Sequence, residues 1–233
     1  MSHPATFPRL SAAALFASTL LLTACATVTT VPIAEDARAH IHVVSVNASV
    51  NLPTDMTFMG KGQGTALLLG GPLLGTLIAS KTAEAPKAEL IASMQANHIV
   101  LADIVAAEFA KEASKKAGAI QFVVGDAPAD ARVELSVISY GVAQSQPLGS
   151  ALYPLLNVSA VMKTPDGRVV WQASEFAGPH NADNKVGHTY DEYAKDPELL
   201  RQAFVTGSDI ASRMLADNLM GREAVQGVPG VQR

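Results

Sequence analysis

The stretch 155–176, with the sequence LLNVSAVMKTPDGRVVWQASEF, decides the fold class of this chain. On both sides of Pro165-Asp166-Gly167, apolar and polar side chains alternate, which is the pattern of strands that bury one face. Proline pre-sets φ in a turn and glycine can adopt a positive φ, so the tripeptide favours a tight connection. The sequence therefore predicts an antiparallel hairpin of two strands, over 155–163 and 168–176.

Further strands are predicted outside this hairpin. Residues 132–141 alternate in the same way and would complete a three-strand meander. The predicted faces of this strand are Val133, Leu135 and Val137 on one side, and Ile138 and Tyr140 on the other. Residues 41–52 and 120–124 also have strand patterns. Together these segments predict an antiparallel sheet of about four to five strands.

Two helices are predicted, one before and one after the meander. Residues 97–117 carry apolar side chains at helical spacing, and Gly118 favours the end of that helix. Asp196-Pro197-Glu198 is a typical helix start, with a capping carboxylate and proline in the first turn. This second helix is predicted to end at Gly221. Both helices would cover one side of the sheet, so that residues 40–221 form a single α+β domain.

A glycine-rich apolar segment, residues 60–80, interrupts this pattern and carries no charge between Lys61 and Lys81. On a helix, Gly71, Gly75 and Ala79 would form a stripe of small residues that lets two helices approach closely. Gly70-Gly71-Pro72 should break one continuous helix, however. The alternatives are a loop that folds back on its own domain, contact with a membrane, and self-association. Residues 86–95 are predicted to form a linker or a helical turn.

The N-terminal segment has the features of a secretory signal that ends on the chain's single cysteine. Arg9 precedes a short apolar run over 10–22, and Leu22-Thr23-Ala24-Cys25 follows. This tetrapeptide resembles the lipobox of bacterial lipoproteins. The resemblance implies cleavage before Cys25 and acylation of its sulfur and its new amine, which gives slow release from the membrane. A buried structural cysteine and a transmembrane helix are the alternatives, and the run is shorter than the roughly 20 residues that a span needs.

The lipoprotein resemblance also implies a domain organisation and an address. It implies a signal over 1–24 and a tether over 25–39, while 222–233 are predicted to form a disordered tail. Because Ala26 rather than an aspartate follows the cysteine, it implies the periplasmic face of the outer membrane. The order of predicted elements also resembles, more loosely, that of envelope-assembly lipoproteins and of the auxiliary lipoproteins of ABC transport systems. That likeness implies a non-enzymatic accessory or scaffold of an envelope complex, with an envelope protein or further copies of the chain as partners.

Few other residues carry a signal for chemistry. The sequence contains no G-x-S-x-G elbow and no H-E-x-x-H pair. Residues 178–189 are interpreted as a solvated polar loop, so no metal site is predicted, and the alternative is that His180, Asp183 and His188 offer ligands to zinc. The competing functional hypothesis is therefore a periplasmic metal- or ligand-binding protein, or a hydrolase, that uses residues 180–192. With 17 basic and 21 acidic residues, the chain has no electrostatic reason to bind nucleic acid, and no cofactor is predicted.

Overall fold

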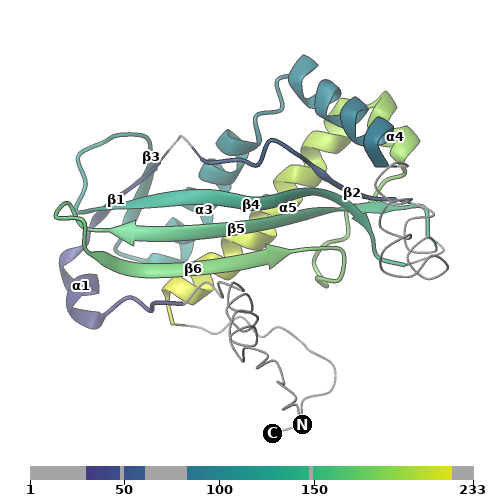
Figure 1. Cartoon of the computed structure of the whole chain (residues 1–233). Helices are drawn as coiled ribbons and strands as arrows, with labels where there is room; N and C mark the ends of the chain where they lie inside the picture. Colours follow the sequence, from purple (N-terminus) through teal and green to yellow (C-terminus); the bar gives the residue numbers. More distant parts are fainter. Residues whose placement is uncertain (1–29, 48–49, 61–82, 147–148, 222–233) are drawn as a thin grey trace, which may run out of the picture.

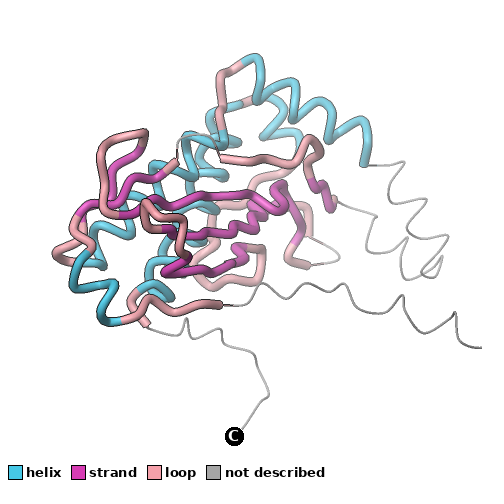
Figure 2. The backbone as a smooth tube through the Cα atoms, turned by 60° about the vertical axis from the view of Figure 1, so that its left-hand side comes forward, coloured by secondary structure: helices cyan, strands magenta, loops and turns pink. Residues whose placement is uncertain are grey.

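The computed structural model describes residues 30–47, 50–60, 83–146 and 149–221. Cys25, the predicted stripe of Gly71, Gly75 and Ala79, and the predicted tail lie outside these residues. The described residues form a sheet with helices packed against one face (Figure 1), and Figure 2 separates helices from strands in a view turned by 60°. The predicted α+β class is confirmed, while the sheet differs from the prediction in its strand directions.

Six strands form one sheet within the described residues, in the order β3-β1-β4-β5-β6, and β2 pairs with β4. Their bounds are β1 Val43–Val46, β2 Thr57–Met59, β3 Gln121–Val124, β4 Ala131–Gln144, β5 Leu152–Lys163 and β6 Val169–Ala177.

The predicted meander is present. β4 pairs antiparallel with β5, and β5 pairs antiparallel with β6. At the hairpin turn the backbone N–H of Gly167 donates to the carbonyl oxygen of Thr164 at 2.8 Å, and Gly167 has a φ of 87°. Glycine adopts a positive φ at little cost in free energy because it has no Cβ atom, which explains why position 167 is a glycine.

The prediction of a purely antiparallel sheet is wrong. β1 runs parallel to both of its neighbours, β3 and β4, and β2 also runs parallel to β4. Parallel neighbours need a long crossover, and here two helices lie between β2 and β3 in the chain. Alternation of apolar and polar residues reports a strand and its buried face but not its direction, so the sequence pattern could not distinguish the two arrangements.

A β-bulge in β4 changes the predicted faces of that strand. The register with β5 shifts between Val137 and Ser139, and Ile138 is left 48% exposed. An extra residue reverses the alternation beyond it. Tyr140 therefore lies on the same buried face as Val137, not opposite to it, and its ring packs against Phe204 with centroids 6.1 Å apart.

The two predicted helices are α3, Leu101–Ala117, and α5, Pro197–Leu219, and they lie side by side on one face of the sheet (Figure 1). α3 ends at Gly118, which has a φ of 62°. The carboxylate of Asp196 caps α5 by accepting a hydrogen bond from the backbone N–H of Glu198 at 2.9 Å. The predicted start and stop signals of these helices therefore have the expected structural roles.

The described residues also form three helices that were not predicted as such: α1, Glu35–His40, a helix over Ala83–Ala96, and α4, Tyr190–Lys195. The segment 86–95, predicted as a linker or a single turn, belongs to the second of these. Within the described ranges no single helix has the length and hydropathy to cross a membrane. Only Ala83–Ala96 and α3, taken together as a pair bent by 72°, meet those criteria.

The fold begins earlier in the chain than the predicted boundary at residue 40. Val31 forms an antiparallel bridge with Gln172 of β6, with N···O distances of 2.8 and 3.0 Å in the two directions. Ile33 is buried in the core, and Nη2 of Arg38 donates to the carbonyl oxygen of Leu219 at the end of α5. Most of the segment predicted as a tether is therefore part of the domain.

Candidate functional site

The loop 178–189, which holds the candidate zinc ligands His180, Asp183 and His188, is fixed to the sheet by a buried asparagine. Nδ2 of Asn184 donates to the carbonyl oxygens of Pro154 and Gly178, each at 2.9 Å. Asn181 accepts a hydrogen bond from the backbone N–H of Gly178 at 2.6 Å. These hydrogen bonds hold the loop against the sheet, so it is part of the folded domain rather than a freely solvated segment.

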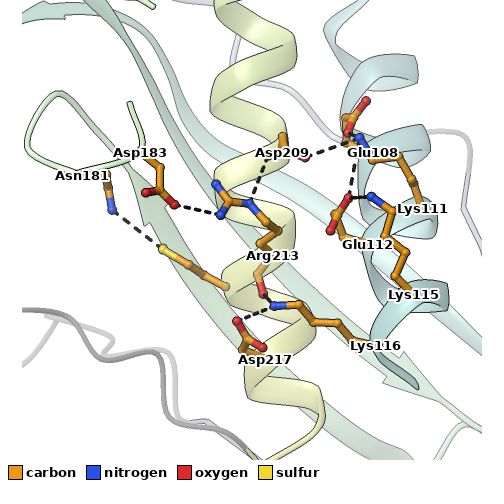
Figure 3. Close-up of polar contacts among 11 residues, drawn as sticks. Glu108, Lys111, Glu112, Lys115, Lys116, Asn181, Asp183, Asp209, Arg213 and Asp217 are labelled. Atoms are coloured by element: carbon orange, nitrogen blue, oxygen red, sulfur yellow. Dashed lines mark hydrogen bonds and ion pairs between the residues drawn. The ribbon is translucent and has the colours of Figure 1, made fainter. Parts of the chain in front are cut away.

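Asp183 forms an ion pair with α5. Its carboxylate accepts a hydrogen bond from Nη1 of Arg213 at 2.8 Å, while Nε of Arg213 donates to Asp209 at 3.0 Å. Figure 3 shows the guanidinium between these two carboxylates. Asp183 therefore has a cation as its partner already.

The two histidines of the predicted set occupy separate environments. His180 lies at an exposed turn. The ring of His188 packs edge-on against Tyr193 with centroids 5.5 Å apart, and its backbone pairs with that of Leu152. Among the described residues, the group of His180, Asp183 and His188 does not bring its ligand atoms within 4.8 Å of one another. The fold gives each of the three a different neighbourhood.

The densest group of charged side chains lies between α3 and α5, and we call it the α3–α5 charge cluster (Figure 3). Five carboxylates and four cations take part in it and in its link to the loop. They are Glu108, Glu112, Asp183, Asp209 and Asp217, with Lys111, Lys115, Lys116 and Arg213. The charges nearly balance, as expected of an ion-pair network.

Three carboxylates of this cluster are close enough to share one cation. The ligand atoms of Glu108, Glu112 and Asp209 all lie within 4.8 Å of one another, and Glu112 is only 4% exposed. The ammonium group of Lys111 contacts all three: it is bonded to Glu108 and lies 3.6 Å from Glu112 and 3.4 Å from Asp209. Lys115 adds a contact of 2.6 Å to Glu112.

These contacts keep Lys111 charged. Its hydrogen bond to Glu108 raises the pKa of Lys111 above its ordinary value, and the charge of Asp209 adds to the effect. A divalent ion would have to displace this ammonium. The arrangement therefore joins two helices by charge pairing, and it offers no open coordination position at the three carboxylates.

The spacing of the charged residues in the sequence is typical of such a cluster. Glu108, Lys111, Glu112 and Lys115 recur at spacings of three and four, as do Asp209 and Arg213, so each set lies along one helical stripe. Two such stripes on neighbouring helices can pair. The sequence pattern does not indicate how α3 and α5 cross, and it is this crossing that places Lys111 in contact with Asp209.

A polar hollow of about 360 Å³ lies at one end of the sheet, beside the β5–β6 turn. It is lined by Arg132, Glu134 and Lys163 among others. Each of its cations has a carboxylate partner, because Arg132 pairs with Asp126 and Lys163 pairs with Glu134, each at 2.6 Å. The hollow therefore presents compensated charges rather than a free cation for an anionic ligand.

Comparison with known proteins gives no family. No family model matches the chain, and no curated protein matches it. Among solved structures, the dodecamer of a PelC variant from Paraburkholderia phytofirmans aligns over 76% of this chain and 88% of its own, at 10% identity and a TM-score of 0.34. Protein XCC0632 from Xanthomonas campestris, described with the family model DUF330, aligns over 82% and 89%, at 12% identity and a TM-score of 0.34. Likenesses at this level carry no function to this chain.

Proposed function

We propose that this protein is an outer-membrane lipoprotein, anchored through acylated Cys25, that acts as a non-enzymatic accessory or scaffold of an envelope transport or assembly complex. The observation that carries the proposal is Leu22-Thr23-Ala24-Cys25, placed at the end of a signal-like segment. Several acyl chains on one residue give stable attachment without a spanning helix.

The environment of the 178–189 loop supports this proposal over the metal-binding alternative. Asp183 is paired with Arg213, and the ring of His188 is packed against Tyr193. A zinc site would need these groups to leave their present partners and converge. The loop instead joins β5, β6 and α5, which suits a rigid domain that presents its surface to a partner.

Lipidation is tested in a two-membrane bacterium fed an alkyne-bearing fatty acid. The unaltered chain should incorporate the label and begin at Cys25 by mass spectrometry, and Cys25→Ser should do neither. Ala26→Asp is the matched control, because it should keep the label but move from the outer to the inner membrane fraction. An unlabelled product that begins at Met1 would refute the proposal.

The accessory role is tested separately by cross-linking in intact cells. Known components of an envelope transport or assembly complex should co-purify with the lipidated protein and not with Cys25→Ser at equal abundance. Zinc-dependent hydrolysis by the purified lipoprotein, in the absence of such components, would favour the alternative.

A further inference from the structure

We infer that the lipid anchor holds the domain in one orientation, with α1 and the β6 edge of the sheet against the lipid surface and the β3 edge directed away from it. The inference rests on the proposed acylation of Cys25. It depends on three observations. They are the position of the first described residue that pairs with the sheet, the contacts that hold this part of the chain in place, and the order of the strands across the sheet.

The chain between the anchor and the fold is short. Among the described residues, Val31 is the first that is bonded to the sheet, and it is six residues beyond Cys25. A fully extended chain spans at most about 3.6 Å per residue, so these two Cα atoms lie within about 22 Å of each other. Acyl chains on Cys25 would hold its backbone at the bilayer surface.

The domain is larger than this reach. A compact domain of about 190 residues has a radius of gyration of about 16 Å and is therefore roughly 40 Å across. If Val31 were on the side far from the membrane, the chain would have to span about twice the available length. Val31 must consequently lie on the half of the domain that faces the lipid.

The start of the fold cannot detach easily to lengthen this connection. Val31 makes both backbone hydrogen bonds of its bridge to Gln172. Ile33 and Ala37 are buried in the core, and Arg38 is bonded to Leu219 at the end of α5. Releasing Val31 would break two hydrogen bonds and expose Ile33 to water, and both changes oppose detachment.

The register of the sheet identifies the edge that lies farthest from Val31. Val31 pairs with Gln172, which pairs with Val161, which pairs with Glu134. Val133, the residue of β4 next to Glu134, pairs with Val46 of β1, and Val46 pairs with Val124 of β3. Val124 thus lies five strand spacings from Val31, about 24 Å across the sheet. It is also exposed, at the opposite edge.

The charge near Val31 gives no separate attraction to anionic lipid. The exposed residues of α1 include Glu35 and Asp36 as well as His40, with Arg38 half-buried. Two carboxylates face one arginine there, so α1 carries no net positive charge. The covalent anchor and its length, rather than electrostatic attraction, therefore set the orientation, which should not depend on salt.

The test uses the lipidated full chain in phosphatidylethanolamine–phosphatidylglycerol vesicles. Because the only natural thiol is acylated, Ala34→Cys near Val31 or Val124→Cys at the far edge supplies a single labelling site. A fluorophore at residue 34 should be quenched at least twofold more by a nitroxide headgroup lipid than one at residue 124. The difference should persist in 0.5 M salt. Equal quenching, or stronger quenching at residue 124, would overturn the inference.

A longer connection is the matched control. Insertion of about twenty glycine and serine residues between Thr29 and Thr30 adds roughly 25 Å of reach and should remove the difference between the two labels. Flotation with the vesicles separates the two possible failures. A chain that does not float lacks the anchor, which refutes the proposed function, whereas a chain that floats with equal quenching refutes the orientation alone.

Discussion

The guanidinium of Arg213 holds the carboxylate of Asp183 at 2.8 Å, so the centre of the loop 178–189 is fastened to α5. The same guanidinium reaches Asp209, which in turn contacts Lys111 of α3. One continuous set of charge pairs thus joins the loop and both long helices. Changes to its members should affect stability before they affect any chemistry.

Asp183→Asn should weaken the attachment of the loop without changing metal content. The pair is largely exposed, so the expected loss in the free energy of unfolding is below about 1 kcal/mol, measured by urea denaturation. Zinc content, measured by atomic emission on protein purified without chelators, should equal that of the unaltered chain. Stoichiometric zinc that disappears in the variant would support the metal-binding hypothesis instead.

Glu112→Ala should cost more, because Glu112 is 4% exposed and bonded to Lys115 at 2.6 Å. A hydrogen bond to a charged group contributes about 2 kcal/mol, and we expect a loss of that size in urea denaturation. Glu134→Ala is the control, since it removes a pair of the same length, to Lys163, that is more exposed. Equal losses in the two variants would mean that burial of the α3–α5 charge cluster adds nothing to the free energy of unfolding.

Glu175 should make stability depend on pH in the acid range. It lies on the helix-facing side of β6 at 8% exposure, and burial raises its pKa above the ordinary value. A raised carboxyl pKa means that stability is fullest below the unfolded pKa and falls as pH rises through the folded pKa.

Glu175→Gln removes that ionisation, so it should make the domain more stable at pH 7. The gain should shrink to nothing below the ordinary glutamate pKa, where Glu175 is protonated in both states. Thermal unfolding between pH 3.5 and 7.5 measures this difference. A gain that does not change with pH would contradict an ionisation effect.

Ser208 and Ser114 offer a matched pair of hydroxyl deletions on the two long helices. Oγ of Ser208 is fully buried without a hydrogen-bond partner among the described residues. Oγ of Ser114 accepts a hydrogen bond from the backbone N–H of Phe122 at 3.1 Å. Ser208→Ala should therefore stabilise the domain and Ser114→Ala should destabilise it, each by about 1 kcal/mol, in urea denaturation. Equal changes of one sign would contradict this assignment.

The sequence predicted the elements whose signals are local. The Pro165-Asp166-Gly167 turn, the Gly118 stop and the Asp196 cap depend on the conformations of single residues, and each has its predicted role. The parallel pairing of β1 could not be predicted in this way, because it depends on how distant segments meet. The helix over Ala83–Ala96 was missed because its large apolar residues, Leu90, Ile91 and Met94, all lie in its second half and give no stripe along the first.

The candidate site was predicted less well, for a related reason. Residue types at His180, Asp183 and His188 suited zinc, but ligand geometry is a property of the folded loop, and Arg213 comes from a different element. The fold boundary was misplaced because Pro32 suggested an interrupted, unstructured segment. Backbone pairing of Val31 with Gln172 leaves no signature in the side-chain pattern.

The bulge at Ile138 makes β4 intolerant of changes in length. Its one extra residue lets Val137 and Tyr140 lie on the same buried face of the sheet. Removing residue 138 would turn the phenol ring of Tyr140 and the side chains beyond it to the opposite face, toward water, whereas residues 165–167 lie outside both flanking strands. Homologous chains that vary in length should therefore vary at the turn and keep the count between Ala131 and Gln144 constant.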